Sequence, residues 1–268
     1  MRQYVALIGM LFALAGVSPA SADSQFLAQK GFMKKSQERA EDGGGGRSSI
    51  RPSGLVPSFP GDAACPIIAS PFGSATRYDG SRRPADRFGG LHGGIDLTLD
   101  EGTPLLAIAS GRIISVGTGG QAEGIYLWLQ HAPEDTGLPF WLYSKYQHLL
   151  EVPRNVVGEK VQVGQVVGLS GKTGTTGGHY GARGYPHLHL TTFAGRSDQY
   201  EGQGSRIFAE AARIFDPVAM YVRGLNDLDE IDRLPDDRKT VPIPYLAENG
   251  SIQSNGSLVV WPVGCKSR

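Results

Sequence analysis

The chain has 268 residues, of which 26 are basic and 26 acidic, so its formal net charge is zero. This balance gives no electrostatic reason to expect a nucleic-acid partner or an anionic membrane surface. Glycine (38 residues) and proline (17) are abundant, which favours short strands joined by turns over a helical protein. The length suffices for one large domain or two small ones, with a hydrophobic core.

The first residues are typical of a secretory signal peptide. Arg2 supplies the positive charge, residues 5–17 form an apolar core, and the Ala-Ser-Ala string at 20–22 is a small-x-small cleavage site. The apolar run is too short to span a bilayer comfortably, and no basic stop-transfer cluster follows it directly. We therefore expect residues 1–22 to be removed on export, with no stable membrane insertion afterwards.

A polar segment rich in glycine, serine and proline follows, from residue 23 to 61, and is expected to be a flexible linker. The folded domain is expected from 62 to 224. The two cysteines, Cys65 and Cys265, lie near the ends of the exported chain, where oxidising conditions favour a disulfide between them. The alternative is two buried free thiols. Neither cysteine has a CxxC partner, which excludes a zinc–thiolate site.

From residue 66 onward, short apolar runs alternate with turn signals about every ten residues. This spacing predicts a mainly β protein, built as an antiparallel sandwich or barrel-like sheet with few short helices. Within the run that starts at Ile95, alternation places Ile95, Leu97 and Leu99 toward the core and Asp96 toward the other face. Strands are expected at residues 66–73, 95–99, 105–109, 112–116, 125–131, 141–149 and 185–192, with two brief strands around a glycine turn within 160–168.

After the last of these strands, apolar residues recur at helical spacing, and a short amphipathic helix is expected at residues 205–215. The remaining residues, 225–268, alternate acidic and proline-rich segments and contain one strand-like run at 257–263. We expect them to form a C-terminal tail, which a disulfide to Cys65 would tie back to the domain.

Five polar residues stand out as candidates for chemistry. His187 and His189 flank one leucine, so on a strand both imidazoles project from the same face. His92 precedes Asp96 by four residues, and the glycines between them let the backbone carry His92 back toward Asp96. His148 ends another strand. A catalytic zinc takes three protein ligands and leaves a position for water; His92, Asp96 and either histidine of the HLH pair make such a set.

A series of motifs in this chain resembles the lysostaphin-type (LytM-type) zinc peptidases, which cut peptide cross-links in bacterial peptidoglycan. The resemblance runs from Ser70 to about Tyr221, and its motifs follow the family's order. They are SPFG at 70–73, LHGGIDL at 91–97, GTPLLAIASGRIISVG at 102–117, YQHL at 146–149, VQVGQVVGLSGKTGTTG at 161–177 and PHLHL at 186–190.

The resemblance implies a LytM-type fold, an antiparallel sheet built on a duplicated hybrid motif with an open active-site groove. It implies that His92, Asp96 and His189 bind one Zn²⁺ per chain and that His148 and His187 form the catalytic pair; which of the two takes the proton stays open. The implied reaction is attack of a zinc-bound water on a peptide carbonyl of peptidoglycan stem peptides. Export without a wall-binding module favours a periplasmic D,D-endopeptidase acting on D-alanine–diamino acid bonds, and otherwise a secreted one.

The alternative function is a non-catalytic activator of other cell-wall hydrolases, because some members of this family have lost zinc ligands. All five positions are retained here, which favours an enzyme. The segment 178–185 is longer than the family's usual connection; it is either a surface loop or a substrate wall in which Arg183 pairs with a stem-peptide carboxylate. The loop 74–90 holds four arginines that either rim the groove or are solvated charge, namely Arg77, Arg82, Arg83 and Arg87. Whether an envelope protein is a partner stays open.

Overall fold

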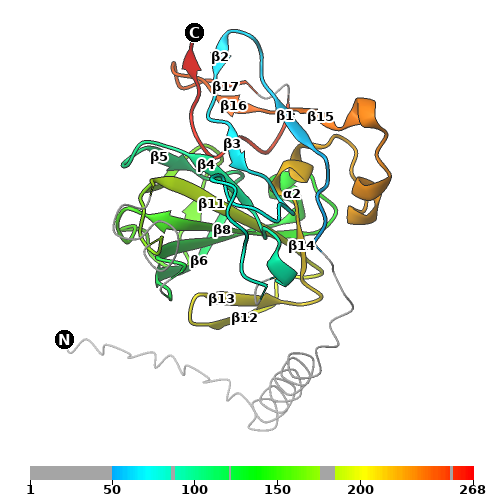
Figure 1. Cartoon of the computed structure of the whole chain (residues 1–268). Coiled ribbons are helices and arrows are strands. Elements are labelled where there is room, and N and C mark those ends of the chain that lie inside the picture. The colour runs from blue at the N-terminus through cyan, green and yellow to red at the C-terminus, as the bar shows by residue number, and fades with distance from the viewer. Residues whose placement is uncertain (1–49, 86–87, 121, 176–184, 254–255) are drawn as a thin grey trace, which may run out of the picture. The chain divides into compact units, whose positions relative to one another are not determined.

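An eight-stranded sheet in which every pairing is antiparallel dominates the computed structural model (Figure 1). The structure describes residues 50–85, 88–120, 122–175, 185–253 and 256–268. In spatial order the strands are β3 (Ile68–Ser70), β4 (Ile95–Thr98), β11 (His187–Gly195), β8 (Trp141–Leu149), β7 (Ile125–His131), β6 (Gly111–Thr118) and β9 (Lys160–Val161), with β14 (Arg213–Phe215) paired to β11. The predicted mainly β, antiparallel fold is confirmed.

The remaining strands form small pairs around this sheet, and the helices are short. The pairs are β5 (Pro104–Leu106) with β10 (Val166–Leu169), β12 (Tyr200–Gln203) with β13 (Arg206–Ala209), β1 (Val56–Ser58) with β15 (Thr240–Pro242), β16 (Tyr245–Leu246) with β17 (Ile252–Gln253), and β2 (Ala63–Ala64) with β18 (Lys266–Ser267). The helices are α2 (Pro133–Thr136) and the 3₁₀ segments η1 (Phe88–Gly90), η3 (Pro217–Tyr221), η4 (Leu228–Arg233) and η5 (Asp236–Arg238). Within the described part, no helix is long and apolar enough to cross a bilayer.

Strand alternation explains how β4 and β11 serve the core and a polar face at once. Leu188 lies opposite Leu97, and Leu190 lies opposite Ile95. All four side chains are fully buried, and each contributes about 1.5–3 kcal/mol by leaving water. The residues between them point to the other face of the sheet. The pattern that fills the core therefore also sets the polar residues of the two strands side by side.

The predicted helix at residues 205–215 is wrong, because this segment forms β13, a turn and β14. Ile207 and Ala209, both half-buried, pack against a small apolar cluster on the sheet, so the positions that face the sheet recur every two residues and not every 3.6. Ala211 then adopts a φ of 52°, in the left-handed region that no α-helix contains. The cluster consists of Ile114, Tyr126, Trp128 and Tyr143.

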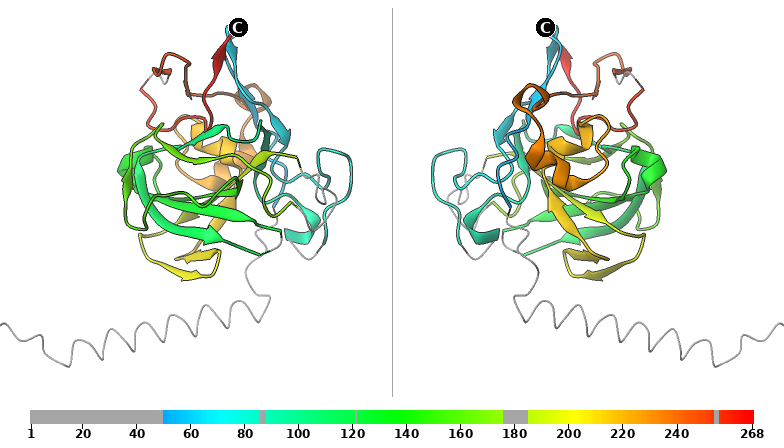
Figure 2. Two further views of the ribbon diagram at one scale, coloured as in Figure 1. Left: turned by 90° about the vertical axis from the view of Figure 1, so that its left-hand side faces the viewer. Right: turned by 90° about the vertical axis from the view of Figure 1, so that its right-hand side faces the viewer.

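The two ends of the described chain pack together and belong to the core. Cys65 and Cys265 form the predicted disulfide, beside the antiparallel pair β2–β18. Ile50 and Leu55 are buried, although residues up to 61 were expected to be linker, and Trp261 in the expected tail has no exposed surface. The packed unit thus extends beyond the expected limits of 62 and 224. Figure 2 shows this end of the domain opposite the hairpin β12–β13. Residues 1–49, with the expected signal peptide, lie outside the described residues.

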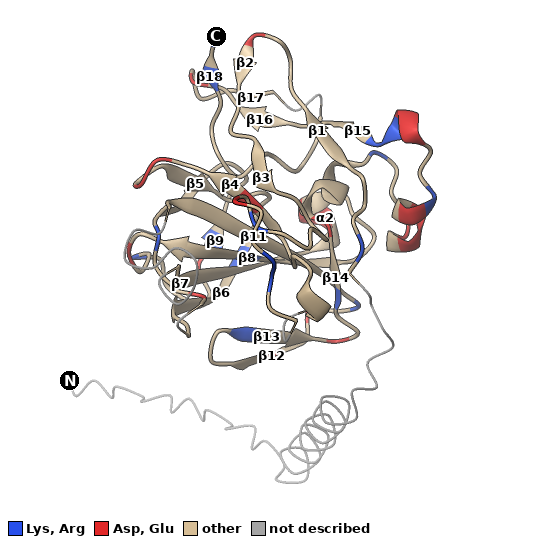
Figure 3. Ribbon diagram, in the orientation of Figure 1, with Lys and Arg blue, Asp and Glu red and all other residues tan. Residues whose placement is uncertain are grey.

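Charged residues of both signs are scattered over the described ribbon, in keeping with the balanced composition (Figure 3). Acidic residues gather at the first turns of η4 and η5, which carry Asp229, Glu230, Asp236 and Asp237. These segments lie outside the eight-stranded sheet. The acidic clusters therefore lie away from the sheet strands, where individual polar side chains set the local charge.

Candidate metal centre

Sheet register brings the first two candidate residues together. Asp96 on β4 lies directly opposite His189 on β11, on the face that is turned away from the core. His92 precedes β4, and the chain must turn tightly for it to reach Asp96. Gly94 makes this possible, because a Cβ at that position would lie 2.3 Å from the carbonyl oxygen of Leu190 and 3.0 Å from His189 Nε2.

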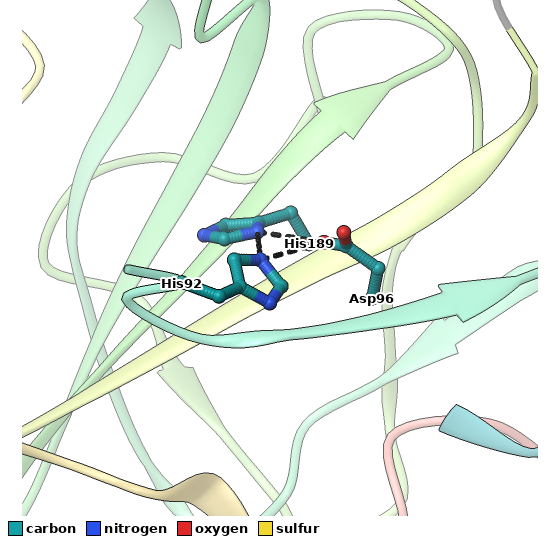
Figure 4. Close-up of side chains that lie close together, drawn as sticks. All are labelled: His92, Asp96 and His189. Carbon is teal, nitrogen blue, oxygen red and sulfur yellow. Dashed lines mark hydrogen bonds and ion pairs between the residues drawn. The ribbon is translucent and has the colours of Figure 1, made fainter. Parts of the chain in front are cut away.

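Three ligand-type atoms converge where these residues meet (Figure 4). His92 Nε2 lies 3.0 Å from His189 Nδ1 and 3.2 Å from Asp96 Oδ1, and His189 Nδ1 lies 2.8 Å from the same oxygen. His187 Nε2 is farther from that oxygen, at 4.0 Å. Spacing in the sequence left the choice between His187 and His189 open, and this geometry brings His189 into the cluster.

The outward ring nitrogens of the two clustered histidines have polar partners. His92 Nδ1 lies 3.1 Å from the carbonyl oxygen of Pro71 and 3.4 Å from Ser70 Oγ. Since a carbonyl can only accept, Nδ1 carries the proton and Nε2 offers its lone pair to the cluster. His189 Nε2 lies 2.9 Å from Thr191 Oγ1. Such contacts hold the rings of metal-binding histidines in place, and sequence reasoning assigned no role to Ser70 or Thr191.

A β-bulge turns His148 toward the same face. On the neighbouring strand Ile125 pairs with Leu149 and Tyr126 pairs with Gln147, so His148 is the extra residue between two paired ones. Its φ is 64°, a left-handed value that is uncommon for a residue with a side chain. Strict alternation would have placed His148 on the core face, opposite to Gln147. The bulge reverses this, and bulges of this kind often aim a side chain at a functional site.

His148 and His187 lie beside the three-residue cluster. The centroid of the His148 ring is 4.5 Å from that of His187 and 6.0 Å from that of His189. His148 Nδ1 donates to the carbonyl oxygen of Thr173 at 2.8 Å, and His187 Nδ1 donates to that of Tyr185 at 3.0 Å. Each of these two rings therefore has Nε2 as its basic nitrogen. All five residues singled out in the sequence thus meet at one place.

Residues 90–200, which contain all five of these residues, match the sequence model of a protein family described as "Peptidase family M23". This segment belongs to peptidase family M23. The lysostaphin-type family suggested by the motifs is thereby confirmed.

The M23 domain is similar in sequence to several curated proteins. Lysostaphin of Staphylococcus simulans is 32% identical over 125 residues, which cover 46% of this chain and 22% of that protein. An uncharacterized metalloprotease of Buchnera aphidicola is 36% identical over 98 residues, which cover 37% of this chain and 22% of that protein. The chain therefore spans less than a quarter of the length of these relatives.

Among solved structures, the catalytic domain of lysostaphin from S. simulans is 30% identical to this chain, with a TM-score of 0.34. That comparison covers 44% of this chain and 77% of the lysostaphin domain. The full-length lysostaphin structure is 25% identical, with a TM-score of 0.36, and covers 53% of this chain and 50% of lysostaphin.

The five residues that meet here, His92, Asp96, His148, His187 and His189, are called the M23 site below. Burial sets the electrostatics of this site. Burial by itself would raise the pKa of Asp96, but the charges and hydrogen bonds of His92 and His189 outweigh it and hold that pKa well below its usual value. Burial lowers the pKa of His189 to about 4 and that of His148 to about 3, and it also lowers the pKa of His187. At neutral pH the site therefore combines the ionised carboxylate of Asp96 with the neutral imidazoles of His148, His187 and His189, and metal ions bind carboxylates and imidazoles in these forms.

The arginines of the 74–90 loop have different surroundings. Arg83 reaches the M23 site, where its Nη2 lies 3.4 Å from Asp96 Oδ2. Arg82 is exposed, and Arg77 bonds within its own loop, donating to the carbonyl oxygen of Arg82 at 2.7 Å. The expectation of solvated charge is met for Arg82 and not for Arg83. Arg87 lies outside the described residues, as do Arg183 and all but the last residue of the segment 178–185.

Among the residues that the structure describes, His131 is the one buried histidine that takes no part in the M23 site. Its Nδ1 donates to the carbonyl oxygen of Ser110 at 2.7 Å, and its Nε2 lies 2.8 Å from Ser144 Oγ. The side chain has no exposed surface, and burial lowers its pKa to about 4. Both ring nitrogens are thus engaged in the core, and His131 serves packing between β7 and β8.

Proposed function

We propose that this chain is an exported zinc metalloendopeptidase that hydrolyses peptide cross-links of peptidoglycan. The observation that supports this function is the convergence of His92, Asp96 and His189 beside a second pair of neutral histidines, within an M23 domain. We assign the first three as ligands of one Zn²⁺ and the second pair, His148 and His187, as the catalytic residues.

The three atoms suit zinc in kind and in spacing. Two imidazole nitrogens and a carboxylate oxygen are ordinary zinc ligands, with bonds of about 2.0–2.2 Å. A tetrahedral ion with such bonds separates its ligand atoms by about 3.3–3.6 Å. The separations here are 2.8–3.2 Å, so the side chains need to open by only a few tenths of an ångström. Three ligands also leave the fourth position that a catalytic ion keeps for water.

The zinc ion and the two catalytic histidines would have different chemical roles. A zinc ion held there would polarise a peptide carbonyl and lower the pKa of a coordinated water. His148 and His187, neutral at pH 7, can each accept a proton at Nε2, and a ring protonated there can then donate to the carbonyl oxygen on which negative charge develops. The carbonyl oxygens of Thr173 and Tyr185 hold the two rings in the tautomer that this role requires.

The substrate class and the compartment belong to the proposal. The signal-like sequence at residues 1–22 supports export, and the disulfide is compatible with an oxidising compartment such as the periplasm. Two relatives, the antimicrobial peptidase lysostaphin and a glycyl-glycine endopeptidase, act on peptide bonds. We propose a D,D-endopeptidase acting on D-alanine–diamino acid bonds, with glycine bridges as the second substrate to test.

Metal analysis paired with a digest of cell-wall sacculi tests this function. Purified protein should contain about one zinc per chain and should convert cross-linked muropeptide dimers into monomers. Removing zinc with a chelator should stop the conversion, and adding zinc back should restore it. A His189→Ala variant should neither hold zinc nor cleave. Sacculi with direct D-alanine–diamino acid links and sacculi with glycine bridges, digested in parallel, identify the bond.

The outcomes separate the candidate functions. Protein that contains zinc but cleaves neither substrate would contradict the proposed substrate class. Protein without zinc and without cleavage would contradict the enzyme and support the non-catalytic activator.

A further inference from the structure

Arg83 enters the proposed metal centre from the loop that precedes His92. Its Nη2 donates to Ser70 Oγ at 2.7 Å and lies 3.4 Å from Asp96 Oδ2. The Arg83 side chain is 17% exposed and that of Asp96 is 8% exposed. This ion pair is therefore largely shielded from water, and salt screens it less than it screens a surface pair.

The two oxygens of Asp96 have separate partners. Oδ1 faces the two clustered histidines, His92 at 3.2 Å and His189 at 2.8 Å. Oδ2, the other oxygen of the carboxylate, lies 3.4 Å from Arg83 Nη2. A carboxylate on a short side chain can rotate, and a cation fixed at one oxygen restricts that rotation. Arg83 therefore keeps Oδ1, and not Oδ2, directed at the place where a metal would bind.

Ser70 extends the same support to a second proposed ligand. It lies opposite Asp96 in the β3–β4 pairing and is 1% exposed. Its hydroxyl oxygen accepts the bond from Arg83 and lies 3.4 Å from His92 Nδ1, the nitrogen that faces away from the cluster. Arg83, Ser70 and two of the three proposed ligands thus form one contiguous set of contacts.

The loop backbone holds Arg83 in position. The N–H of Arg83 donates to the carbonyl oxygen of Ala75 at 3.1 Å, and Thr76 forms an antiparallel bridge with Arg82. The Arg77 side chain closes the turn by donating to the carbonyl oxygen of Arg82. Arg83 and Arg82 therefore sit on the same short ladder, but the side chain of Arg82 is exposed. The chain offers a matched control one residue away.

We propose that Arg83 is a positioning residue for the metal centre, acting on Asp96 directly and on His92 through Ser70. This inference rests on the proposed function, because it concerns the zinc site assigned there. Residues that hold metal ligands in place typically change metal affinity or activity by about 10- to 100-fold when they are removed. The planar fork of arginine suits the task, since one guanidinium can contact a hydroxyl and a carboxylate together.

The sign of the effect separates positioning from simple charge. A guanidinium near a zinc ion repels it, so an arginine that acted only through its charge would weaken zinc binding, and its removal would tighten it. An arginine that orients Asp96 strengthens zinc binding, and its removal weakens zinc binding. Arg83→Ala is therefore expected to raise the zinc dissociation constant by about 10- to 100-fold.

Competition against a chromophoric chelator measures the dissociation constant directly, with zinc alone as the probe and no substrate present. Arg82→Ala, which removes the same charge from the same loop, should leave the constant within about twofold of wild type. Arg83→Lys keeps the charge but not the fork and should lose most of the affinity that Arg83→Ala loses. Ser70→Ala should weaken binding less, and the double variant should lose less than the sum of the two effects, because the residues act together.

Three results would overturn this inference. An unchanged or tighter zinc constant in Arg83→Ala refutes positioning, as does an equal loss in Arg82→Ala. Lost peptide hydrolysis with an unchanged zinc constant would make Arg83 a substrate-binding residue instead. Thermal unfolding of each metal-free variant checks that the fold is intact. Failure of the proposed function is distinct, because wild-type protein would then bind no zinc, or would bind zinc without cleaving either substrate, and both results are read before any variant is compared.

Discussion

Replacing Cys65 and Cys265 with alanine should remove a large part of the stability of the domain. The two residues are 200 positions apart, so the disulfide closes a loop that contains the whole M23 segment. For a loop of this length, the chain-entropy relation gives about 5 kcal/mol at 25 °C, from restriction of the unfolded chain. Small domains are stable by about 5–15 kcal/mol in total. The variant should therefore unfold at much lower denaturant concentration.

Urea unfolding followed by tryptophan fluorescence measures this loss, because Trp261 is buried beside the disulfide-linked ends. Wild type treated with a reductant should match the double variant. Zinc content should be unchanged under native conditions, since β2 and β18 lie outside the sheet that carries the metal site. A change in unfolding free energy below about 1 kcal/mol would refute the reasoning, and would mean that the two ends stay together without the covalent link.

Three other predictions address a core histidine, a ring contact and the C-terminal segment. Burial lowers the pKa of His131 to about 4 in the folded protein, whereas a histidine in the unfolded chain has a pKa near 6.5. Neutral His131 therefore contributes fully to the free energy of unfolding above pH 6.5, and this contribution should fall by about 3 kcal/mol as the pH drops to 4. The free energy of unfolding of His131→Gln, measured in urea, should depend less on pH than that of wild type. An equal pH dependence in the two proteins would contradict this. Tyr185→Ala should lower kcat about 2- to 10-fold with zinc content unchanged, because the Tyr185 ring stacks on His187 at 4.4 Å; loss of zinc in the variant would argue against this role. Truncation after Gly224 removes the buried Trp261 and should abolish cooperative thermal unfolding, and a folded, active fragment would show that the segment is dispensable.

Much of the fold and most of the site are predictable because they depend on short-range patterns. Alternation along Ile95–Thr98 and His187–Gly195 fixes which side chains enter the core. The HxxxD and HxH spacings identify the polar residues on the opposite faces, and motif order identifies the family. The prediction of a helix at 205–215 failed because a short-range pattern can fit more than one structure. Its apolar residues fit two periods, and packing of Ile207 and Ala209 on the sheet decides for the strand.

The sequence by itself determined most strands of the main sheet, the family and the five polar residues, and it favoured the cysteine pairing. Only the tertiary structure decided how those residues face one another. The bulge that turns His148 onto the site depends on its pairing with β7. Asp96 meets His189 because β4 and β11 adopt one register, and the partners of Arg83 follow from a loop fold that no local pattern specifies. Period and spacing are properties of neighbouring residues, whereas register, bulges and loop contacts arise from free energy summed over segments that are distant in the chain.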